Sequence, residues 1–161
     1  LVKGENVMLG YWNNEEETKK VLKDGWLHTG DIGIFEDGYL KITDRKKDIL
    51  ITPGGDNISP VKIENELSNS RFIDQSIVYG DNKPYLVALL VLSDDNINVT
   101  QDQIKKELEN INKNLSKIEK IKKFFIINEK FSIENGMLTP TLKLKRYKIV
   151  EKYKNEFEKL Y

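Results

Sequence analysis

The stretch that decides the fold runs from residue 29 to residue 60 and reads TGDIGIFEDGYLKITDRKKDILITPGGDNISP. Apolar residues alternate with other residues on both sides of Asp37-Gly38, a dipeptide typical of the two-residue turn of a β-hairpin. The charged run DRKKD at 44–48 joins this hairpin to a short apolar run at 49–51. Gly54-Gly55 follows and predicts a tight turn.

Downstream of this stretch, strand and helix patterns are mixed. Ser59 is a good N-cap and Pro60 suits the first position of a helix. Apolar runs at 73–79 and 85–92 predict two strands, and the second is almost wholly apolar, which predicts a central strand. A helical stripe follows, formed by Ile104, Leu108, Ile111 and Leu115. Residues 124–127 predict one more strand, and a second stripe predicts a final helix with Val150, Tyr153, Phe157 and Leu160. Because adjacent strands can form hairpins between helices, we expect an α+β fold.

Upstream, the signals are local. Residues 1–12 predict a strand and a turn. Asn13 or Asn14 can cap a short helix, since the acidic run at 15–17 then falls in its first turn. Gly25 predicts the end of that helix, and the following Trp26 is interpreted as a buried packing residue.

The composition excludes several functional classes. The 161 residues carry 26 basic and 26 acidic side chains, so no net charge favours nucleic acid or a membrane surface as partner. The absence of cysteine excludes disulfides, thiolate metal sites and a cysteine nucleophile, and the single His28 cannot build a multi-histidine metal site. No apolar run has the length of a transmembrane segment and no signal peptide is visible. The chain starts with Leu1, and we expect a cytoplasmic piece of something longer.

Several residues have both a structural and a chemical interpretation. Asp31 is either a turn residue or a carboxylate that accepts hydrogen bonds from two ribose hydroxyls. Arg45 is a solvated linker residue, or a planar donor for phosphate and ribose oxygens. Gly54-Gly55 forms a turn, or lets backbone approach a ligand. Lys143 belongs to a solvated basic run with Lys145, Arg146 and Lys148, or supplies a positive charge to a reaction.

The order of the motifs is more specific than any one of them. GWLHTGD at 25–31, DRKKD at 44–48 and GGDNISP at 54–60 together resemble the acyl-adenylate-forming enzymes, which include acyl-CoA synthetases, peptide-synthetase adenylation domains and beetle luciferases. VMLGYW at 7–12 and LTPTLKLKR at 138–146 resemble the motifs of that superfamily on either side, so the likeness covers nearly the whole chain. Many relatives have glycine before the final lysine, whereas this chain has Leu142, which resembles the long-chain acyl-CoA synthetase branch.

The resemblance implies a role for each candidate residue. Asp31 and Arg45 would bind the nucleotide, ATP or AMP. Lys47 would be the hinge about which a small domain swings, chosen over Lys46 only by its spacing from Arg45. The Gly54-Gly55 loop would line the tunnel for coenzyme A, and Lys143 would be the catalytic residue of adenylation.

The resemblance also implies an architecture. Residues 1–45 would be the tail of a large N-terminal domain that is otherwise absent, and 46–161 a small mobile C-terminal domain with a mixed sheet flanked by helices. The implied function is that of a long-chain fatty acid–CoA ligase, which uses ATP with Mg²⁺ and coenzyme A. No metal ligand is identifiable in the sequence. Two alternative functions stay open: transfer to a carrier-protein thiol, and a non-catalytic folded module. For the cytoplasmic parent, a peripheral contact with the inner face of a membrane also stays open.

Overall fold

The hairpin predicted around Asp37-Gly38 is present as β3 (Asp31–Glu36) and β4 (Tyr39–Arg45), which pair antiparallel. Asp37 and Gly38 have φ values of 50° and 82°. A two-residue hairpin loop of this kind needs positive φ at both positions, because only then does the turn match the twist of the strands. The dipeptide therefore sets the register, in which Glu36 faces Tyr39.

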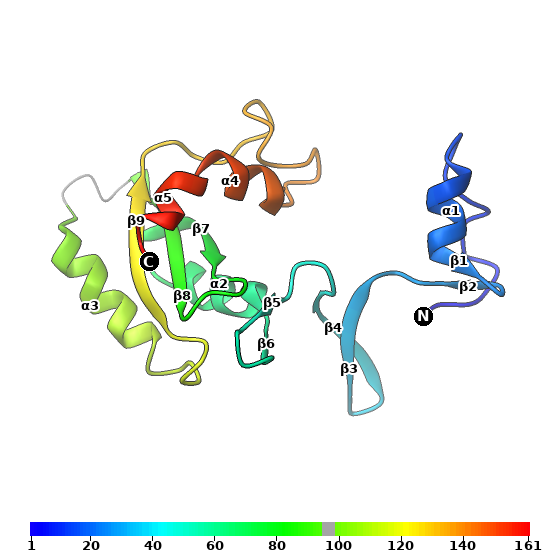
Figure 1. Cartoon of the computed structure of the whole chain (residues 1–161), viewed down its shortest axis with the longest axis horizontal. Coiled ribbons are helices and arrows are strands. Elements are labelled where there is room, and N and C mark those ends of the chain that lie inside the picture. The colour runs from blue at the N-terminus through cyan, green and yellow to red at the C-terminus, as the bar shows by residue number, and fades with distance from the viewer. Residues whose placement is uncertain (95–98) are drawn as a thin grey trace. The chain divides into compact units, whose positions relative to one another are not determined.

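The computed structural model describes residues 1–94 and 99–161, and its chain divides into two compact units, Leu1–Lys47 and Asp48–Tyr161 (Figure 1). Unit 1 contains the hairpin together with α1 (Glu15–Val21), β1 (Leu22–Lys23) and β2 (Trp26–Leu27). Asn14 is the N-cap of α1, and its side-chain oxygen accepts a hydrogen bond from the Glu17 amide at 3.1 Å. The predicted cap is thus confirmed.

Three expectations for unit 1 are wrong. Gly25 does not end α1, because the helix stops at Val21 and Gly25 lies in the turn between β1 and β2. Trp26 is not buried but 42% exposed, with the Lys3 ammonium above its ring. Residues 1–12 form turns and contribute only an isolated bridge between Val2 and Leu27, not a strand.

Unit 2 is built on a three-stranded sheet. Its order is β7-β8-β9, with β7 antiparallel and β9 parallel to the central β8, so the sheet is mixed. The elements in chain order are β5 (Leu50–Ile51), β6 (Asn57–Ile58), α2 (Pro60–Ser68), β7 (Ile73–Tyr79), β8 (Leu86–Leu92), α3 (Gln101–Ile111), β9 (Ile121–Ile127), α4 (Arg146–Lys152) and α5 (Lys154–Glu158). Ser59 caps α2 through its hydroxyl, and Pro60 is its first residue, as predicted.

Alternation along β8 explains how the helices are distributed. Successive side chains of a strand point to opposite faces, and β8 is buried over Leu86–Val91. Leu86, Ala88 and Leu90 join one core with residues of α2 and α3, whereas Val87, Leu89 and Val91 join a second core with residues of α4 and α5. The sheet therefore separates two helical layers, which confirms the predicted α+β class and the central position of this strand.

The predicted final helix is wrong in one respect, because it is two helices. α4 ends at Lys152 and α5 begins at Lys154, with Tyr153 between them at φ −104° and ψ 22°. Tyr153 leaves the helical conformation and donates a hydrogen bond from its hydroxyl to Glu129 at 2.8 Å. Its ring nevertheless stays in the second core with Phe157, so the apolar stripe is correct although the helix is broken.

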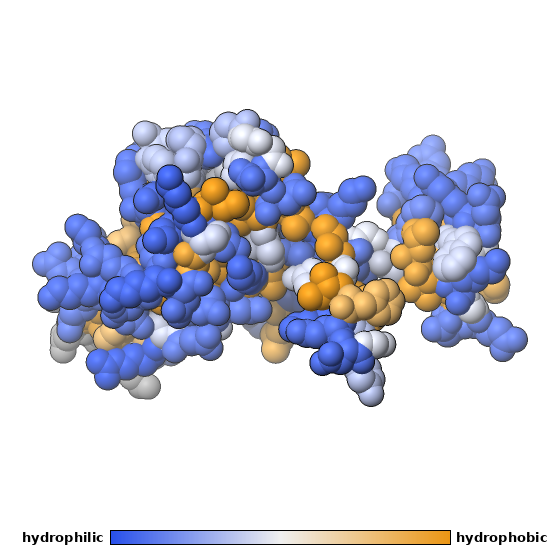
Figure 2. Space-filling view, turned by 90° about the horizontal axis from the view of Figure 1, so that it is seen from below, coloured by the Kyte–Doolittle hydropathy of each residue, from blue (hydrophilic) through white to orange (hydrophobic). Residues whose placement is uncertain are grey.

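Surface character differs along the chain. Within the described residues, no helix is long and apolar enough to cross a membrane. The β3–β4 hairpin leaves six large hydrophobic side chains exposed: Ile32, Ile34, Phe35, Tyr39, Leu40 and Ile42. Figure 2 shows hydrophobic residues, in orange, uncovered among the polar surface on the face that it displays.

Candidate functional site

Asp31 and Arg45 are brought together by the hairpin register. They face each other across β3 and β4, and the Arg45 Nε lies 2.8 Å from the Asp31 Oδ1. The Asp31 side chain is 25% exposed and that of Arg45 53% exposed, so the pair is open to solvent and contributes at most about 1 kcal/mol to stability. A carboxylate has about four acceptor positions, and this geometry therefore lets Asp31 accept further hydrogen bonds while it is paired.

The surroundings of the pair fix its backbone. The Asp31 amide donates to the Thr29 hydroxyl at 3.1 Å, and the Lys46 amide donates to the Gly30 carbonyl at 2.8 Å. Asp44, which sequence analysis did not single out, is buried and accepts a hydrogen bond from the Arg45 amide at 2.6 Å. These contacts hold the start of β3 and the end of β4 in one arrangement.

Lys47 lies in the turn that follows β4, with an exposed side chain. It is the last residue of unit 1, and Asp48 is the first of unit 2. A residue that joins two compact units is the kind of position at which a change of backbone angles can move one unit relative to the other.

The Gly54-Gly55 loop is a tight turn between β5 and β6. The Gly55 amide donates to the Thr52 carbonyl at 2.9 Å, and the Thr52 amide donates to the Asp56 carbonyl at 2.9 Å. Gly55 has φ +87°, and a Cβ built on it would meet nothing within 4 Å. The backbone conformation, not crowding, therefore favours glycine at this position, and the open space lets another molecule approach its backbone.

Lys143 sits near the tip of a small hairpin-like loop. The Thr139 amide donates to the Lys143 carbonyl at 2.8 Å, and the Lys143 amide donates to the Thr139 hydroxyl at 3.0 Å. The side chain is exposed, and its ammonium has no hydrogen-bond or ion-pair partner within the described ranges. Leu142 adopts φ +59°, a left-handed backbone conformation that suits glycine better than leucine.

Sequence analysis missed the ion pair of Glu64 and Arg146, which is the most deeply buried pair in the described chain. The Arg146 Nη2 lies 2.6 Å from the Glu64 Oε2, and the two side chains are 14% and 10% exposed. Arg146 was seen only as part of a basic run. The available signal was the position of Glu64 directly after the buried Ile63 on α2, since a buried carboxylate needs a partner.

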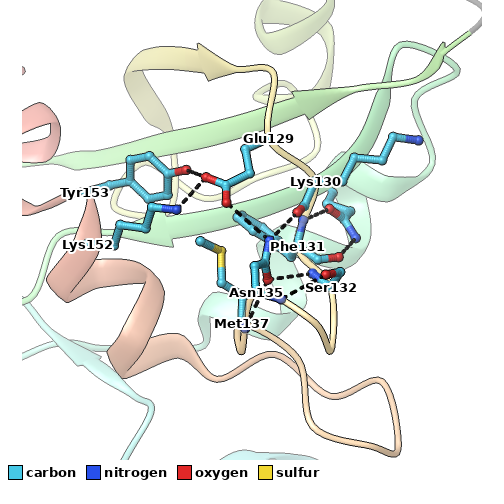
Figure 3. A network of polar contacts seen from close by, with 9 residues as sticks. Glu129, Lys130, Phe131, Ser132, Asn135, Met137, Lys152 and Tyr153 are labelled. Atoms are coloured by element: carbon cyan, nitrogen blue, oxygen red, sulfur yellow. Dashed lines mark hydrogen bonds and ion pairs between the residues drawn. The ribbon is translucent and has the colours of Figure 1, made fainter.

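A second network, drawn in Figure 3, holds the segment between β9 and the Lys143 loop. Lys152 and the Tyr153 hydroxyl both donate to the Glu129 carboxylate. The Asn135 side chain bonds the backbone of Lys130 and Met137. The Lys152 and Tyr153 hydrogen bonds keep the pKa of Glu129 below its usual value, while burial and the bond to Glu129 raise the pKa of Tyr153. Both groups thus keep their ordinary charge states at neutral pH.

One cavity of unit 2 does not involve the candidate residues. Its volume is about 350 Å³, and it lies between α3 and β9 with Leu108, Phe124 and Ile126 among its lining residues. Within the described residues, no cluster of three histidine, cysteine or acidic side chains could hold a metal ion.

The fold and motifs define an adenylate-forming type of C-terminal domain. A family model described as the AMP-binding enzyme C-terminal domain matches residues 47–161, and the chain belongs to this family. This finding confirms the resemblance on which the sequence motifs were interpreted.

The similar curated proteins are long-chain-fatty-acid–CoA ligases. The chain is 36% identical to FadD15 of Mycobacterium tuberculosis, over 100% of the chain and 30% of that protein. It is 40% identical to long-chain-fatty-acid–CoA ligase 5 of Rattus norvegicus, over 99% of the chain and 27% of that protein. The chain thus spans less than a third of the length of these relatives.

Solved structures show the same fold. The adenylation domain of a carboxylate reductase from Mycobacterium chelonae matches with a TM-score of 0.90 and 29% identity, over 99% of this chain and 27% of that one. The A-PCP didomain of a carboxylic acid reductase from Segniliparus rugosus, in complex with AMP, matches with a TM-score of 0.87 and 26% identity, over 99% of this chain and 24% of that one. O-succinylbenzoate coenzyme A synthetase from Bacillus subtilis, in complex with AMP, matches with a TM-score of 0.70 and 30% identity, over 90% of this chain and 28% of that one.

Proposed function

We propose that this chain is the C-terminal part of a long-chain fatty acid–CoA ligase. The observation that carries the proposal is the similarity to long-chain-fatty-acid–CoA ligases along 99–100% of the chain at 36–40% identity. In the proposed reaction, the fatty acid carboxylate attacks the α-phosphate of ATP to give acyl-adenylate and pyrophosphate. The thiol of coenzyme A then attacks the acyl carbon, and AMP leaves.

The nucleotide role falls to the first unit. Asp31 keeps acceptor positions open beside Arg45, which fits the two hydroxyls of a ribose, and Arg45 is exposed enough to offer donors to phosphate or ribose oxygens. We assign residues 1–45 to the tail of a large N-terminal domain and 46–161 to a small mobile domain. Mg²⁺ would accompany ATP, with ligands outside this chain.

The second unit would contribute one loop to each half-reaction. Lys143 is an exposed cation without a partner in the described chain, so it can meet the negative charge that develops during adenylation. The Gly54-Gly55 turn has open space beside the backbone of Gly55, which suits contact with the arm of coenzyme A in the second step. A change of backbone angles at Lys47 would present first one loop and then the other.

The decisive experiment is Lys143→Ala in the enzyme that carries this chain together with its large domain. We expect adenylation to slow by roughly 10²- to 10³-fold, since one charge aimed at a transition state is worth on the order of 3 kcal/mol. Thioester formation from preformed acyl-adenylate and coenzyme A should be largely spared. The two half-reactions are measured separately by pyrophosphate release and by acyl-CoA formation.

Lys145→Ala is the matched control. If Lys145→Ala slows adenylation and Lys143→Ala does not, the wrong lysine has been assigned. If neither change matters, the basic run is only a solvated surface and the catalytic assignment fails.

A second candidate keeps the adenylation step and changes the acceptor to a carrier-protein thiol. The observation that favours it is the similarity to the A-PCP didomain of a carboxylic acid reductase. Supplying ATP and fatty acid with coenzyme A as the only acceptor thiol separates the two candidates, because only the CoA ligase then releases AMP in step with thioester formation.

For the ligase we further propose a cytoplasmic location, with a peripheral contact to the inner face of a membrane that supplies its long-chain substrate.

A further inference from the structure

The Lys143 loop is a two-stranded ladder whose base lies directly before Arg146. The Lys145 amide donates to the Met137 carbonyl at 2.8 Å, Leu138 forms an antiparallel bridge with Leu144, and Thr139 pairs with Lys143. Each residue pair of the ladder is therefore held by the pair that lies nearer to Arg146. The position of Lys143 depends on how firmly the base of this ladder is held.

One side of the base is held by burial. Met137 and Leu138 belong to the core formed with α4 and α5. The segment leading to them is tied to β7, because the Gln75 side chain accepts a hydrogen bond from the Phe131 amide at 2.7 Å and donates to its carbonyl at 3.0 Å.

The other side of the base is held by Arg146, the first residue of α4. Its Nη2 lies 2.6 Å from Glu64 Oε2, and its Nη1 donates to the Val78 carbonyl at 3.1 Å. Glu64 Oε1 in turn accepts the Val78 amide at 2.7 Å. The guanidinium, the carboxylate and the residue Val78 thus form a closed ring of hydrogen bonds that joins α4, α2 and β7.

This ring uses the shape of arginine as well as its charge. Two nitrogens of the planar fork bond to two acceptors in fixed directions, whereas a lysine ammonium is a point charge on a flexible stem. The N-cap of α4, Lys145, makes no side-chain capping bond. The start of α4, and with it the end of the Lys143 ladder, is therefore fixed by the Arg146 ring and not by a cap.

We propose that Arg146 is a positioning residue for adenylation: through Glu64 and Val78 it holds the base of the 137–145 ladder and so places the Lys143 ammonium. This inference rests on the proposed role of Lys143. Glu64 also lies on α2, the helix that begins directly after the Gly54-Gly55 turn and β6, so the same ring joins the elements behind both proposed catalytic loops.

The test uses Arg146→Lys, which keeps the charge opposite Glu64 but loses the fork. In the 161-residue chain, amide hydrogen exchange is measured at Lys143 and Lys145, whose amides donate across the ladder to the Thr139 hydroxyl and the Met137 carbonyl. We expect exchange at these amides to become about tenfold or more faster, with exchange in β8 unchanged. In the enzyme with its large domain, adenylation should slow about 10- to 100-fold, since misplacement by about 1 Å can cost a factor of 10², while the KM for ATP and the thioester step stay within about threefold.

The matched control is Lys148→Gln, two residues further along the same helix with an exposed side chain, which should change neither readout. If Arg146→Lys leaves ladder exchange or adenylation at the parent value, the proposal is wrong. Faster exchange throughout β8 would also overturn it, because Arg146 would then stabilise the fold as a whole. If instead Lys143→Ala leaves adenylation intact, the proposed catalytic role of Lys143 fails, and the exchange at Lys143 and Lys145 still reports whether Arg146 holds the ladder.

Discussion

Leu142 is the residue whose backbone conformation conflicts most with its side chain. It holds φ +59° with a side chain that is 69% exposed, so little burial offsets the left-handed backbone, which costs a non-glycine residue about 1–2 kcal/mol. Glycine would remove that penalty, although its greater freedom in the unfolded chain takes back about 0.4–1 kcal/mol. We expect Leu142→Gly to raise the free energy of unfolding by up to about 1 kcal/mol, measured by urea denaturation.

Leu142→Ala separates the effect of the backbone conformation on stability from the effect of the leucine side chain. Alanine keeps the left-handed penalty and loses only an exposed side chain, so its stability should stay within about 0.5 kcal/mol of the parent. An alanine variant clearly less stable than the parent would show that the leucine side chain makes a stabilising contact, and a glycine variant no more stable than the alanine variant would contradict the assigned backbone penalty.

Glu129 makes stability depend on pH through its partners. Hydrogen bonds from Lys152 and Tyr153 lower its pKa in the folded chain, so its ionised form stabilises the fold above the ordinary glutamate pKa of about 4.3. This contribution is lost as the pH falls through the lowered value. We expect Lys152→Gln to reduce stability at pH 7 and to have a smaller effect in acid, as measured by thermal unfolding across the pH range.

Lys148→Gln is the control on the same helix, because Lys148 has no ion pair within the described ranges. Its effect should be small and independent of pH between about 3 and 7. A Lys152→Gln effect that stayed constant down to pH 3 would contradict the assignment of this pH dependence to Glu129.

Among the elements, the turn from β4 to β5 is the one expected to move. Proline fixes φ near −65°, so Lys47→Pro would lock one orientation of the small domain in the enzyme that carries both domains. We expect the thioester half-reaction to be impaired more than adenylation. The two half-reactions are measured separately, with pyrophosphate release for the first and acyl-CoA formation from preformed acyl-adenylate for the second.

Lys46→Ala is the control at the neighbouring position. The Lys46 amide donates to the Gly30 carbonyl, and alanine keeps that bond and the freedom of residue 47. Both half-reactions should therefore proceed near the parent rate. Equal loss of both half-reactions in a folded Lys47→Pro enzyme would remove Lys47 as the hinge.

Elements with a local signal could be predicted from the sequence. Asp37-Gly38 requires the observed turn, Asn14 and Ser59 provide side-chain acceptors for helix starts, and the apolar run at 86–92 became the central strand. In each case the deciding interaction lies within a few residues or follows from hydrophobic content. Asp31 and Arg45 also come together because a hairpin register aligns its strand ends.

The elements that could not be predicted depend on distant partners. Tyr153 breaks the last helix while its hydroxyl bonds Glu129, 24 residues away, with no glycine or proline to mark the break. Glu64 and Arg146 are 82 residues apart, so neither reveals the other in the sequence. The cap at Ser59 identified the start of α2, but not which cation would meet the buried carboxylate on that helix.

At the scale of the whole molecule, the chain should not complete the reaction by itself. Asp31 and Lys143 lie in different units, and the chain spans less than a third of its curated relatives. We expect the 161-residue chain, given ATP, oleate and coenzyme A, to release no pyrophosphate above background. Turnover that is reproducible and scales with the chain's concentration would show that the separate large domain is not needed.

The β3–β4 hairpin has a practical consequence for anyone who prepares this protein. Its uncovered Ile34, Phe35 and Leu40 side chains lie on a lone pair of strands, a combination that promotes edge-to-edge aggregation. The chain also has equal numbers of positive and negative charges, so little electrostatic repulsion keeps copies apart near neutral pH. Expression of residues 48–161 without the hairpin is therefore the better route to concentrated samples for spectroscopy.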